Sequence, residues 1–191
     1  MLSRREVIFN NTIDLLLSVN WTQKITAKHY DTLSFYSTFI KWGKVVGVLL
    51  TSTTVATLFA RNTVWAKALA ILGTLILTTL EIISNQFNIE KSMAILFNAK
   101  EDLWNIKTDI TGLAREIKCS SDEDLGNLAN KYGVLLSQVK KIQSSIPSAP
   151  NRDVNKASKD INDRHDNDLW ENRKQLLPPD LLHFKENDNC Q

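Results

Sequence analysis

A chain of 191 residues with 23 Lys and Arg against 21 Asp and Glu has a net charge of only +2. This length holds about one domain with appendages, which excludes a multidomain enzyme, and the charge is too small to favour direct nucleic-acid binding. Three of the four prolines, Pro150, Pro178 and Pro179, lie in the last quarter, so the preceding sequence can be helical almost without interruption.

The first forty residues are predicted to form an amphipathic helical segment. Its apolar side chains recur at the spacing of one helix face, at Phe9, Ile13, Leu16, Leu17 and Trp21. Leu33, Tyr36 and Ile40 continue the pattern toward a long apolar region. We therefore assign residues 1–40 to N-terminal cytoplasmic helices that lead into a membrane.

Two uncharged runs follow in tandem. Val45–Ala60 carries no charge over sixteen residues, and Ala68–Leu80 is also uncharged and continues past Glu81 in apolar residues. A span needs ~20 predominantly apolar residues, and flanking lysines can extend their charges away from the bilayer. The segment Arg61–Lys67 is too short to do more than turn the chain back. A transmembrane hairpin is therefore predicted over residues 41–89.

The basic residues around this hairpin predict its orientation. Most lie outside the turn, at Lys24, Lys28, Lys41, Lys44, Lys91 and Lys100, whereas the turn holds Arg61 and Lys67. The positive-inside rule then leaves both termini in the cytoplasm. The alternative reading of two such short apolar runs is a pair of buried helices in a soluble bundle.

Polar residues recur along one face of the second span. Lys67, Thr74, Thr78, Glu81 and Asn85 follow one another at spacings of seven, four, three and four. One interpretation is a pore lined by several copies, because a single hairpin cannot enclose a channel. The other is that Glu81 marks the cytoplasmic interface while the threonines bond back to helix carbonyls. The candidate pore or gating residues are Thr51, Thr54, Thr74, Thr78, Glu81 and Asn85.

Small residues mark the first span. Gly43 and Gly47 form a GxxxG pair, and Thr51 and Thr54 continue along the same side. Small side chains let two helices approach closely, so Gly43 and Gly47 are the predicted helix-packing residues.

After the hairpin, apolar residues fall into two series of heptad spacing. Such series predict an antiparallel, coiled-coil-like helical hairpin over residues 90–147, and Ser120 with Glu123 has the spacing of a capping box between the two helices. Because an exposed apolar seam seeks a partner, we assign it to self-association or partner binding. The seam residues are Leu96, Leu103, Ile110, Ile117, Leu128, Leu135 and Ile142.

Residues 148–191 are predicted to be a polar, partly disordered tail. Its last apolar stretch, Leu176–Leu182, is either a docking peptide or a patch that folds onto the body. His165–Asp168 has no apolar scaffold to hold it, and Cys119 and Cys190, which we interpret as free thiols, form no metal-binding pattern. We therefore expect no enzyme, no metal site and no cofactor.

The order of these parts resembles the SLATT domains, two-transmembrane effectors of bacterial conflict systems. The resemblance covers roughly residues 10–155 and is one of architecture and scattered positions. It includes Trp21, Ala27 and Tyr30 in the N-terminal helix, the hairpin Val45–Leu80, the long helix after it, and the segment around Tyr132, Leu135 and Leu136. The chain departs from the family in the extended tail after Pro150.

The resemblance implies an effector in the bacterial inner membrane that stays silent until a sensor partner triggers it, then oligomerises and breaches the bilayer. Such sensors belong to nucleotide-signal systems or are reverse transcriptases with their nucleic acid, encoded nearby. The predicted function is therefore abortive antiviral defence, with the lipid bilayer, further copies and a sensor as partners. Two alternatives are a membrane-anchored scaffold that binds a partner through its heptad helices, and a soluble helical adaptor.

Overall fold

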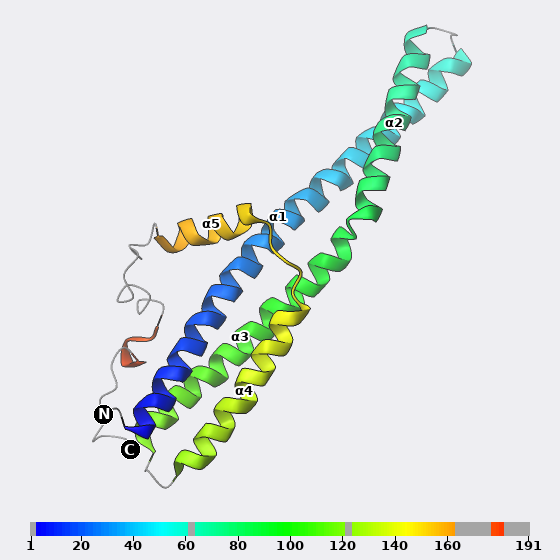
Figure 1. Cartoon of the computed structure of the whole chain (residues 1–191). Helices are drawn as coiled ribbons and strands as arrows, with labels where there is room; N and C mark the ends of the chain where they lie inside the picture. The colour runs from blue at the N-terminus through cyan, green and yellow to red at the C-terminus, as the bar shows by residue number, and fades with distance from the viewer. Residues whose placement is uncertain (1–2, 61–63, 121–123, 163–176, 182–191) are drawn as a thin grey trace. The chain divides into compact units, whose positions relative to one another are not determined.

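The computed structural model describes residues 3–60, 64–120, 124–162 and 177–181, without the side chains of residues 53–60, 66, 161–162 and 179 (Figure 1). The predicted all-α fold class is confirmed, since the described residues are helical almost throughout. The helices are α1 Arg4–Ala60, α2 Val64–Gln86, α3 Ile89–Cys119, α4 Leu125–Ser145, α5 Asn151–Asn162 and the short 3-10 helix η3 Pro179–Leu181. The chain divides into two compact units, one of Met1–His29 with Ile95–Gln191 and one of Tyr30–Ala94.

The first unit is a helical bundle in which the N-terminal part of α1 lies beside α3 and α4 (Figure 1). Phe9, Ile13, Leu16 and Leu17 are buried in its core, as their periodicity predicts, whereas Trp21 stays 36% exposed at the edge. Burying one such aliphatic side chain contributes about 1.5–3 kcal/mol. Tertiary packing of this apolar face therefore holds the N-terminal part of α1 in place.

The predicted heptad seam is buried in the first unit, and all of its residues except Leu96 belong to this core or pack against it. Leu96, Leu103, Ile110, Ile117 and Leu128 are at most 1% exposed, and Leu135 and Ile142 pack partly buried against the core. The expectation that the seam is exposed and available to another copy is therefore wrong for this bundle. The physical reason is that the apolar face of α1, from the same chain, supplies the partner that a heptad seam requires.

Three local features define the ends of α3 and α4. Helix α4 ends at Ser145, and its C-cap residue Ile146 is extended (φ −76°, ψ 127°) because a proline follows it. The Ser120 hydroxyl donates to the Glu116 carbonyl; Glu123, the other member of the predicted capping box, lies outside the described residues, so the box remains a prediction. Cys119 is disulfide-bonded, which corrects the expectation of a free thiol there; Cys190 also lies outside the described residues.

Two parts of the predicted tail are ordered in the first unit. Helix α5 begins directly after Pro150, whose carbonyl accepts hydrogen bonds from the backbone N–H groups of Asp153 and Val154. It buries Asp153 and Ala157, one turn apart. Leu177, which precedes η3, and Leu181, its last residue, are 6% and 1% exposed within the core. Of the two readings of this last apolar stretch, the patch that folds onto the body is the one the structure supports.

The second unit contains the C-terminal part of α1 and an antiparallel α2. Asn88 has φ 43°, the left-handed conformation that Asn tolerates, and it separates α2 from α3. Within the described part of the chain, one helical segment, Lys67–Gln86, is long and apolar enough to cross a membrane, and 6% of it is buried. The other predicted span, Val45–Ala60, forms the last part of α1. The fourfold domain division predicted above remains a prediction.

Candidate functional site

Helices α1 and α2 contact each other closely at three glycines. A methyl group at Gly43 would lie 2.6 Å from Leu80 Cδ1, and one at Gly47 would lie 2.7 Å from Leu77 Cγ. On α2, a methyl group at Gly73 would lie 3.0 Å from Thr51 Cγ2 and 3.4 Å from the backbone nitrogen of that residue. The hairpin is therefore packed through small residues on both helices.

Gly73 was missed by sequence reasoning, although a signal for it exists. Ala66, Ala70 and Gly73 are small residues spaced by four and three positions, so they share one face of α2 with Leu77 and Leu80. This packing face lies one residue away from the predicted polar stripe. The stripe therefore flanks the contact between α1 and α2 instead of forming it.

The antiparallel arrangement gives the hairpin two unlike sides. When two helices run in opposite directions, the residues that follow a pair of contacting residues project to the same side of the pair. Lys44 and Glu81 follow the Gly43–Leu80 contact, and Ser52 and Thr74 follow the contact between Thr51 and Gly73. We name this side the polar side; apart from Val48, which follows the contact between Gly47 and Leu77, its residues are Lys41, Lys44, Ser52, Thr74, Thr78, Glu81 and Asn85.

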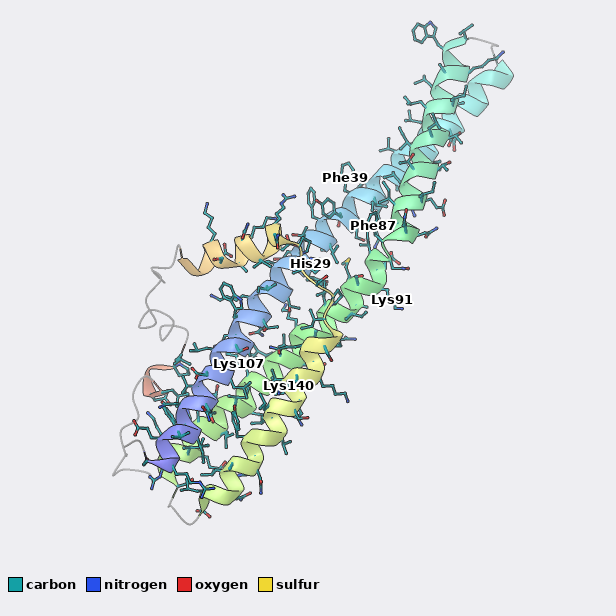
Figure 2. All side chains as sticks on the ribbon, viewed as in Figure 1. His29, Phe39, Phe87, Lys91, Lys107 and Lys140 are labelled. Carbon is teal, nitrogen blue, oxygen red and sulfur yellow. The ribbon has the colours of Figure 1, made fainter. Side chains whose placement is uncertain are left out.

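The opposite side of the hairpin is apolar and exposed. We name it the apolar side, and its residues include Phe39, Trp42, Val46, Leu49, Leu69, Leu72 and Ile83, all of which are 38–67% exposed. Figure 2 labels Phe39 on α1 and Phe87 directly after α2. A surface of this composition is unfavourable in water and favourable in lipid.

The threonines of the predicted pore face use their hydroxyl hydrogens within their own helices. Thr51 Oγ1 lies 3.0 Å from the Gly47 carbonyl oxygen, and Thr74 and Thr78 donate over 2.9 Å to the carbonyls of Ala70 and Thr74. This is the back-bonding that one of the two interpretations of the stripe expects. The hydroxyl oxygens keep lone pairs for a further donor. Glu81 and Asn85 are exposed, and the side chain of Thr54 lies outside the described ones.

Aromatic residues mark the two ends of α2. Trp65 is 82% exposed near its beginning, and Phe87 is 67% exposed just after its end. Twenty-two residues of α-helix are about 33 Å long, which matches a hydrocarbon core of about 30 Å. Glu81 then lies about 9 Å from Phe87 along the helix axis. Its carboxylate is therefore near one edge of the apolar layer.

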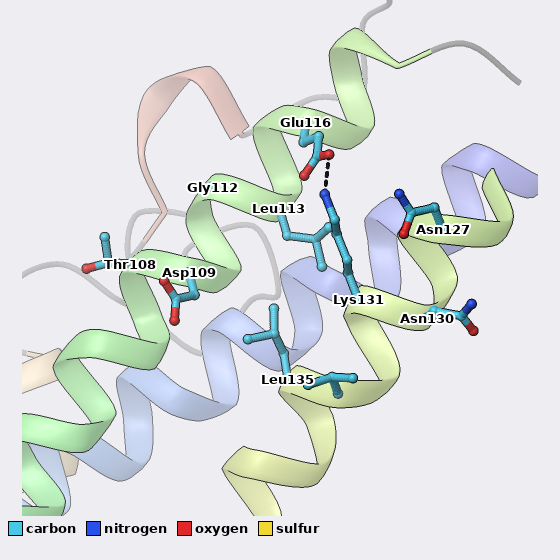
Figure 3. Close-up of a pocket in the computed structure, with 10 residues that line it drawn as sticks. Thr108, Asp109, Gly112, Leu113, Glu116, Asn127, Asn130, Lys131 and Leu135 are labelled. Carbon is cyan, nitrogen blue, oxygen red and sulfur yellow. Dashed lines mark hydrogen bonds and ion pairs between the residues drawn. The ribbon is translucent and has the colours of Figure 1, made fainter. Parts of the chain in front are cut away.

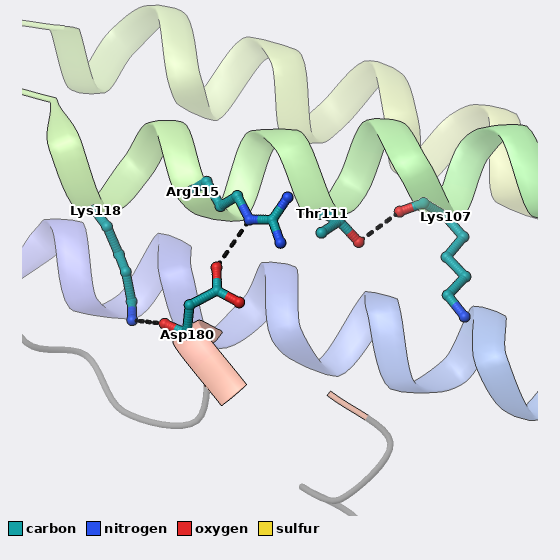
Figure 4. A network of polar contacts seen from close by, with 5 residues as sticks. All are labelled: Lys107, Thr111, Arg115, Lys118 and Asp180. Atoms are coloured by element: carbon teal, nitrogen blue, oxygen red, sulfur yellow. Dashed lines mark hydrogen bonds and ion pairs between the residues drawn. The ribbon is translucent and has the colours of Figure 1, made fainter. Parts of the chain in front are cut away.

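The first unit holds a polar network that sequence reasoning did not anticipate (Figure 4). Arg115 Nε donates to Asp180 Oδ2 over 2.8 Å, and Lys118 Nζ donates to the Asp180 backbone carbonyl. The hydrogen bond from Arg115 holds the pKa of Asp180 below its usual value, and burial lowers the pKa of Lys118. No local pattern signals these contacts, because they join residues more than sixty positions apart.

No metal centre is evident where the structure describes side chains, since no three His, Cys, Asp or Glu residues gather there. The His165–Asp168 cluster considered from the sequence lies outside the described residues.

An exposed apolar helical hairpin together with a bundle that has its own core defines a helical membrane-type domain. The chain belongs to the SMODS and SLOG-associating 2TM effector domain family 4, the SLATT_4 family, whose model matches residues 14–172. The predicted SLATT resemblance is therefore confirmed. The match extends through α5, so the expected departure from the family after Pro150 is wrong as far as residue 172. Searches of curated proteins and of solved structures gave no match.

Family membership carries the coarse functional assignment. The family consists of two-transmembrane effector domains, which indicates a role in conflict or defence systems, a location in the membrane and an association with sensor partners. It is a helical membrane-type family and not a known enzyme family.

Proposed function

We propose that this protein is the membrane effector of a bacterial antiviral system, which self-associates and permeabilises or depolarises the inner membrane when a sensor triggers it. The observation that supports this most is the two-sided hairpin, in which polar residues of α1 and α2 share one side and apolar residues the other. Such a hairpin suits an assembly in which the apolar sides face lipid and the polar sides face one another or water.

The position of Glu81 near the apolar layer gives a physical reason for several hairpins to assemble. A carboxylate against lipid is costly, so it faces a protein interior, water or the headgroups. Glu81 is exposed in the single chain, and one hairpin cannot surround it. Several hairpins with their polar sides turned inward place Glu81 with Lys44, Thr74 and Thr78 along a shared path.

The proposal includes a topology and a class of partner. The hairpin spans the membrane twice with both termini in the cytoplasm, where the first unit is accessible to a sensor protein. That sensor is encoded nearby and belongs to a nucleotide-signal system or is a reverse transcriptase with its nucleic acid. The trigger reaches this chain through the protein partner, without direct nucleic-acid binding by the chain itself.

Overexpression in cells loaded with a membrane-potential dye tests the proposal. The wild-type chain is expected to depolarise the membrane, and Glu81→Leu is expected to depolarise it much less. Glu101→Leu is the matched control, because it removes an exposed carboxylate from α3 outside the hairpin and is expected to act like the wild type. If Glu81→Leu depolarised the membrane as much as the wild-type chain does, the polar side would have no part in the proposed mechanism.

A membrane-anchored scaffold is the competing function, and it predicts a different result. Replacing residues 41–89 with an unrelated two-span anchor abolishes protection in our proposal, since the native hairpin carries the activity. A scaffold keeps its activity after that replacement. Because the heptad seam is filled within the chain, a scaffold also lacks the partner surface first expected for it.

A further inference from the structure

Two of the hollows in the first unit differ in how their polar groups are paired. The larger is a groove of about 630 Å³ between α3 and α4, where Lys131 Nζ lies 2.5 Å from Glu116 Oε1 (Figure 3). The chain therefore satisfies the basic group of this groove by itself. The smaller is a pocket of about 100 Å³ lined by α1, α3 and the segment that joins α4 to α5, and it contains a buried group that the chain leaves open.

That group is the imidazole of His29 on α1 (Figure 2). Its side chain is only 9% exposed, and its Nδ1 is hydrogen-bonded to Asp153 Oδ2. Among the described residues, Nε2 of the same ring has no hydrogen-bond partner. A buried ring nitrogen without a partner is unfavourable, so Nε2 is available to a molecule that enters the pocket.

The two threonines of the pocket use their hydroxyl hydrogens within α1. Thr22 Oγ1 donates to the Ser18 carbonyl over 2.9 Å, and Thr26 Oγ1 donates to the Thr22 carbonyl over 2.8 Å. Thr22 Oγ1 also accepts a hydrogen bond from Gln143 Nε2, whereas Thr26 Oγ1 keeps lone pairs for a further donor. His29 Nε2 and Thr26 Oγ1, about one helical turn apart, are therefore the polar side-chain atoms of the pocket that remain open to a ligand.

The other side chains that line the pocket are apolar, which disfavours a filling of water alone. They are Ile25, Leu96, Ile146, Pro147 and Ala149. A pocket of about 100 Å³ admits several waters, and each buried water needs two to four polar partners. Two open polar atoms do not supply that many partners. A molecule with a short aliphatic body fills the same space and buries its apolar surface.

We propose that this pocket binds a small aliphatic alcohol, with a hydroxyl group on a body of about three or four carbons. A hydroxyl is complementary to His29 in either protonation state of the ring, because it donates to an unprotonated Nε2 or accepts from a protonated one. The aliphatic body packs against Ile25, Leu96 and Pro147. Asp153 fixes the orientation of the ring.

Nitrogen-15 NMR of the full-length, detergent-solubilised chain tests this site. The chain has three histidines, so labelling histidine alone gives few ring resonances, and His29→Gln identifies those of His29. Titration with 1-propanol is expected to shift the Nε2 resonance saturably, with a dissociation constant of about 1–10 mM for so small a ligand. 1-Chloropropane, which has the same shape without the hydroxyl, is expected to bind about tenfold more weakly.

Variants of the segment between α4 and α5 provide the control. Ala149→Leu fills the pocket and is expected to abolish binding of 1-propanol, and Ala149→Val, a smaller change, is expected to weaken it about threefold. Ser148→Leu is the matched control, since Ser148 is exposed and does not line the pocket, and it should bind like the wild type. A shift without saturation, equal binding of 1-chloropropane, unchanged binding in both Ala149 variants, or equal losses in Ala149→Leu and Ser148→Leu would each overturn the inference.

Discussion

His29 Nδ1 lies 2.8 Å from Asp153 Oδ2, and the two side chains, 124 positions apart in the sequence, are only 9% and 1% exposed. The carboxylate accepts a hydrogen bond from the imidazole in the interior of the first unit. Removing one member of a buried pair leaves the other without compensation. The contact therefore joins α5 to α1 in a way that depends on both residues.

Asp153→Ala is expected to release α5 from α1. The loss of a buried partner costs about 3 kcal/mol, and Ala157 is the one apolar residue buried within the described side chains of α5. Hydrogen–deuterium exchange of the α5 amides in detergent should rise by orders of magnitude. Asp160→Ala is the control, because its pair with Lys28 is exposed and such pairs contribute about 0–1 kcal/mol. Comparable exchange in both variants would contradict this role of the buried pair.

Gly47→Ala is expected to loosen the hairpin. Its new methyl group would lie 2.7 Å from Leu77 Cγ. Because this atom is close to the backbone of Leu77, it can move little, and the overpacking costs about 1–3 kcal/mol. Gly43→Ala should cost less, because its methyl group meets the mobile end of Leu80. Gly112→Ala has open space and should stabilise the protein by about 0.5–1 kcal/mol. Melting temperatures in detergent should therefore rank Gly112→Ala, Gly43→Ala and Gly47→Ala from highest to lowest.

The docking of Leu177 and Leu181 is expected to weaken in acid. The hydrogen bond from Arg115 lowers the pKa of Asp180 in the folded chain. The stabilisation from this pair is therefore present above the unfolded pKa of about 3.9, and it is lost as the pH falls through the lower, folded value. Both side chains are about half exposed, so the effect stays below about 1 kcal/mol.

Asp180→Asn tests this pH dependence. It should remove most of the dependence while leaving the segment docked at neutral pH, as followed by hydrogen–deuterium exchange of the amides of Leu177, Asp180 and Leu181. Leu181→Ala should release the segment at every pH, because truncating a buried leucine costs about 2–5 kcal/mol. An Asp180→Asn variant with the wild-type acid profile would assign the dependence to another group.

The features that local periodicity encodes were predictable from the sequence. The apolar face at Phe9, Ile13 and Leu16 and the heptads of α3 and α4 depend only on spacing along one helix, and the structure buries both. It was not predictable that α1 of the same chain covers the heptad seam, because this depends on how α1 packs against α3 and α4. Helix α5 was not anticipated for a related reason, since a buried Asp153 gives no apolar signal.

The candidate site, too, has one part that spacing along a single helix predicts and another that depends on packing between helices. The polar stripe of α2 follows from spacing, but which residues of α1 share its side depends on the register between two antiparallel helices, which the Gly43–Leu80 contact sets. Sequence reasoning placed Thr51 and Thr54 on the side of Gly43 and Gly47 and also named them as candidate pore residues; in the structure Thr51 lies against Gly73, and Ser52 follows it toward the polar side. A one-residue difference in register changes the side to which a residue belongs.

The two sides of the hairpin should differ in their access to water when the effector is active. Thr74→Cys and Thr79→Cys compare the same residue type within one span, since Thr74 lies on the polar side and Thr79 precedes the Gly43–Leu80 contact on the other side. In a background without native cysteines, Thr74→Cys should react with a charged, water-soluble thiol reagent once the membrane depolarises. Thr79→Cys should stay unreactive, because a thiol in lipid ionises little and charged reagents do not reach it. Equal labelling of the two positions would mean that the polar side does not face water.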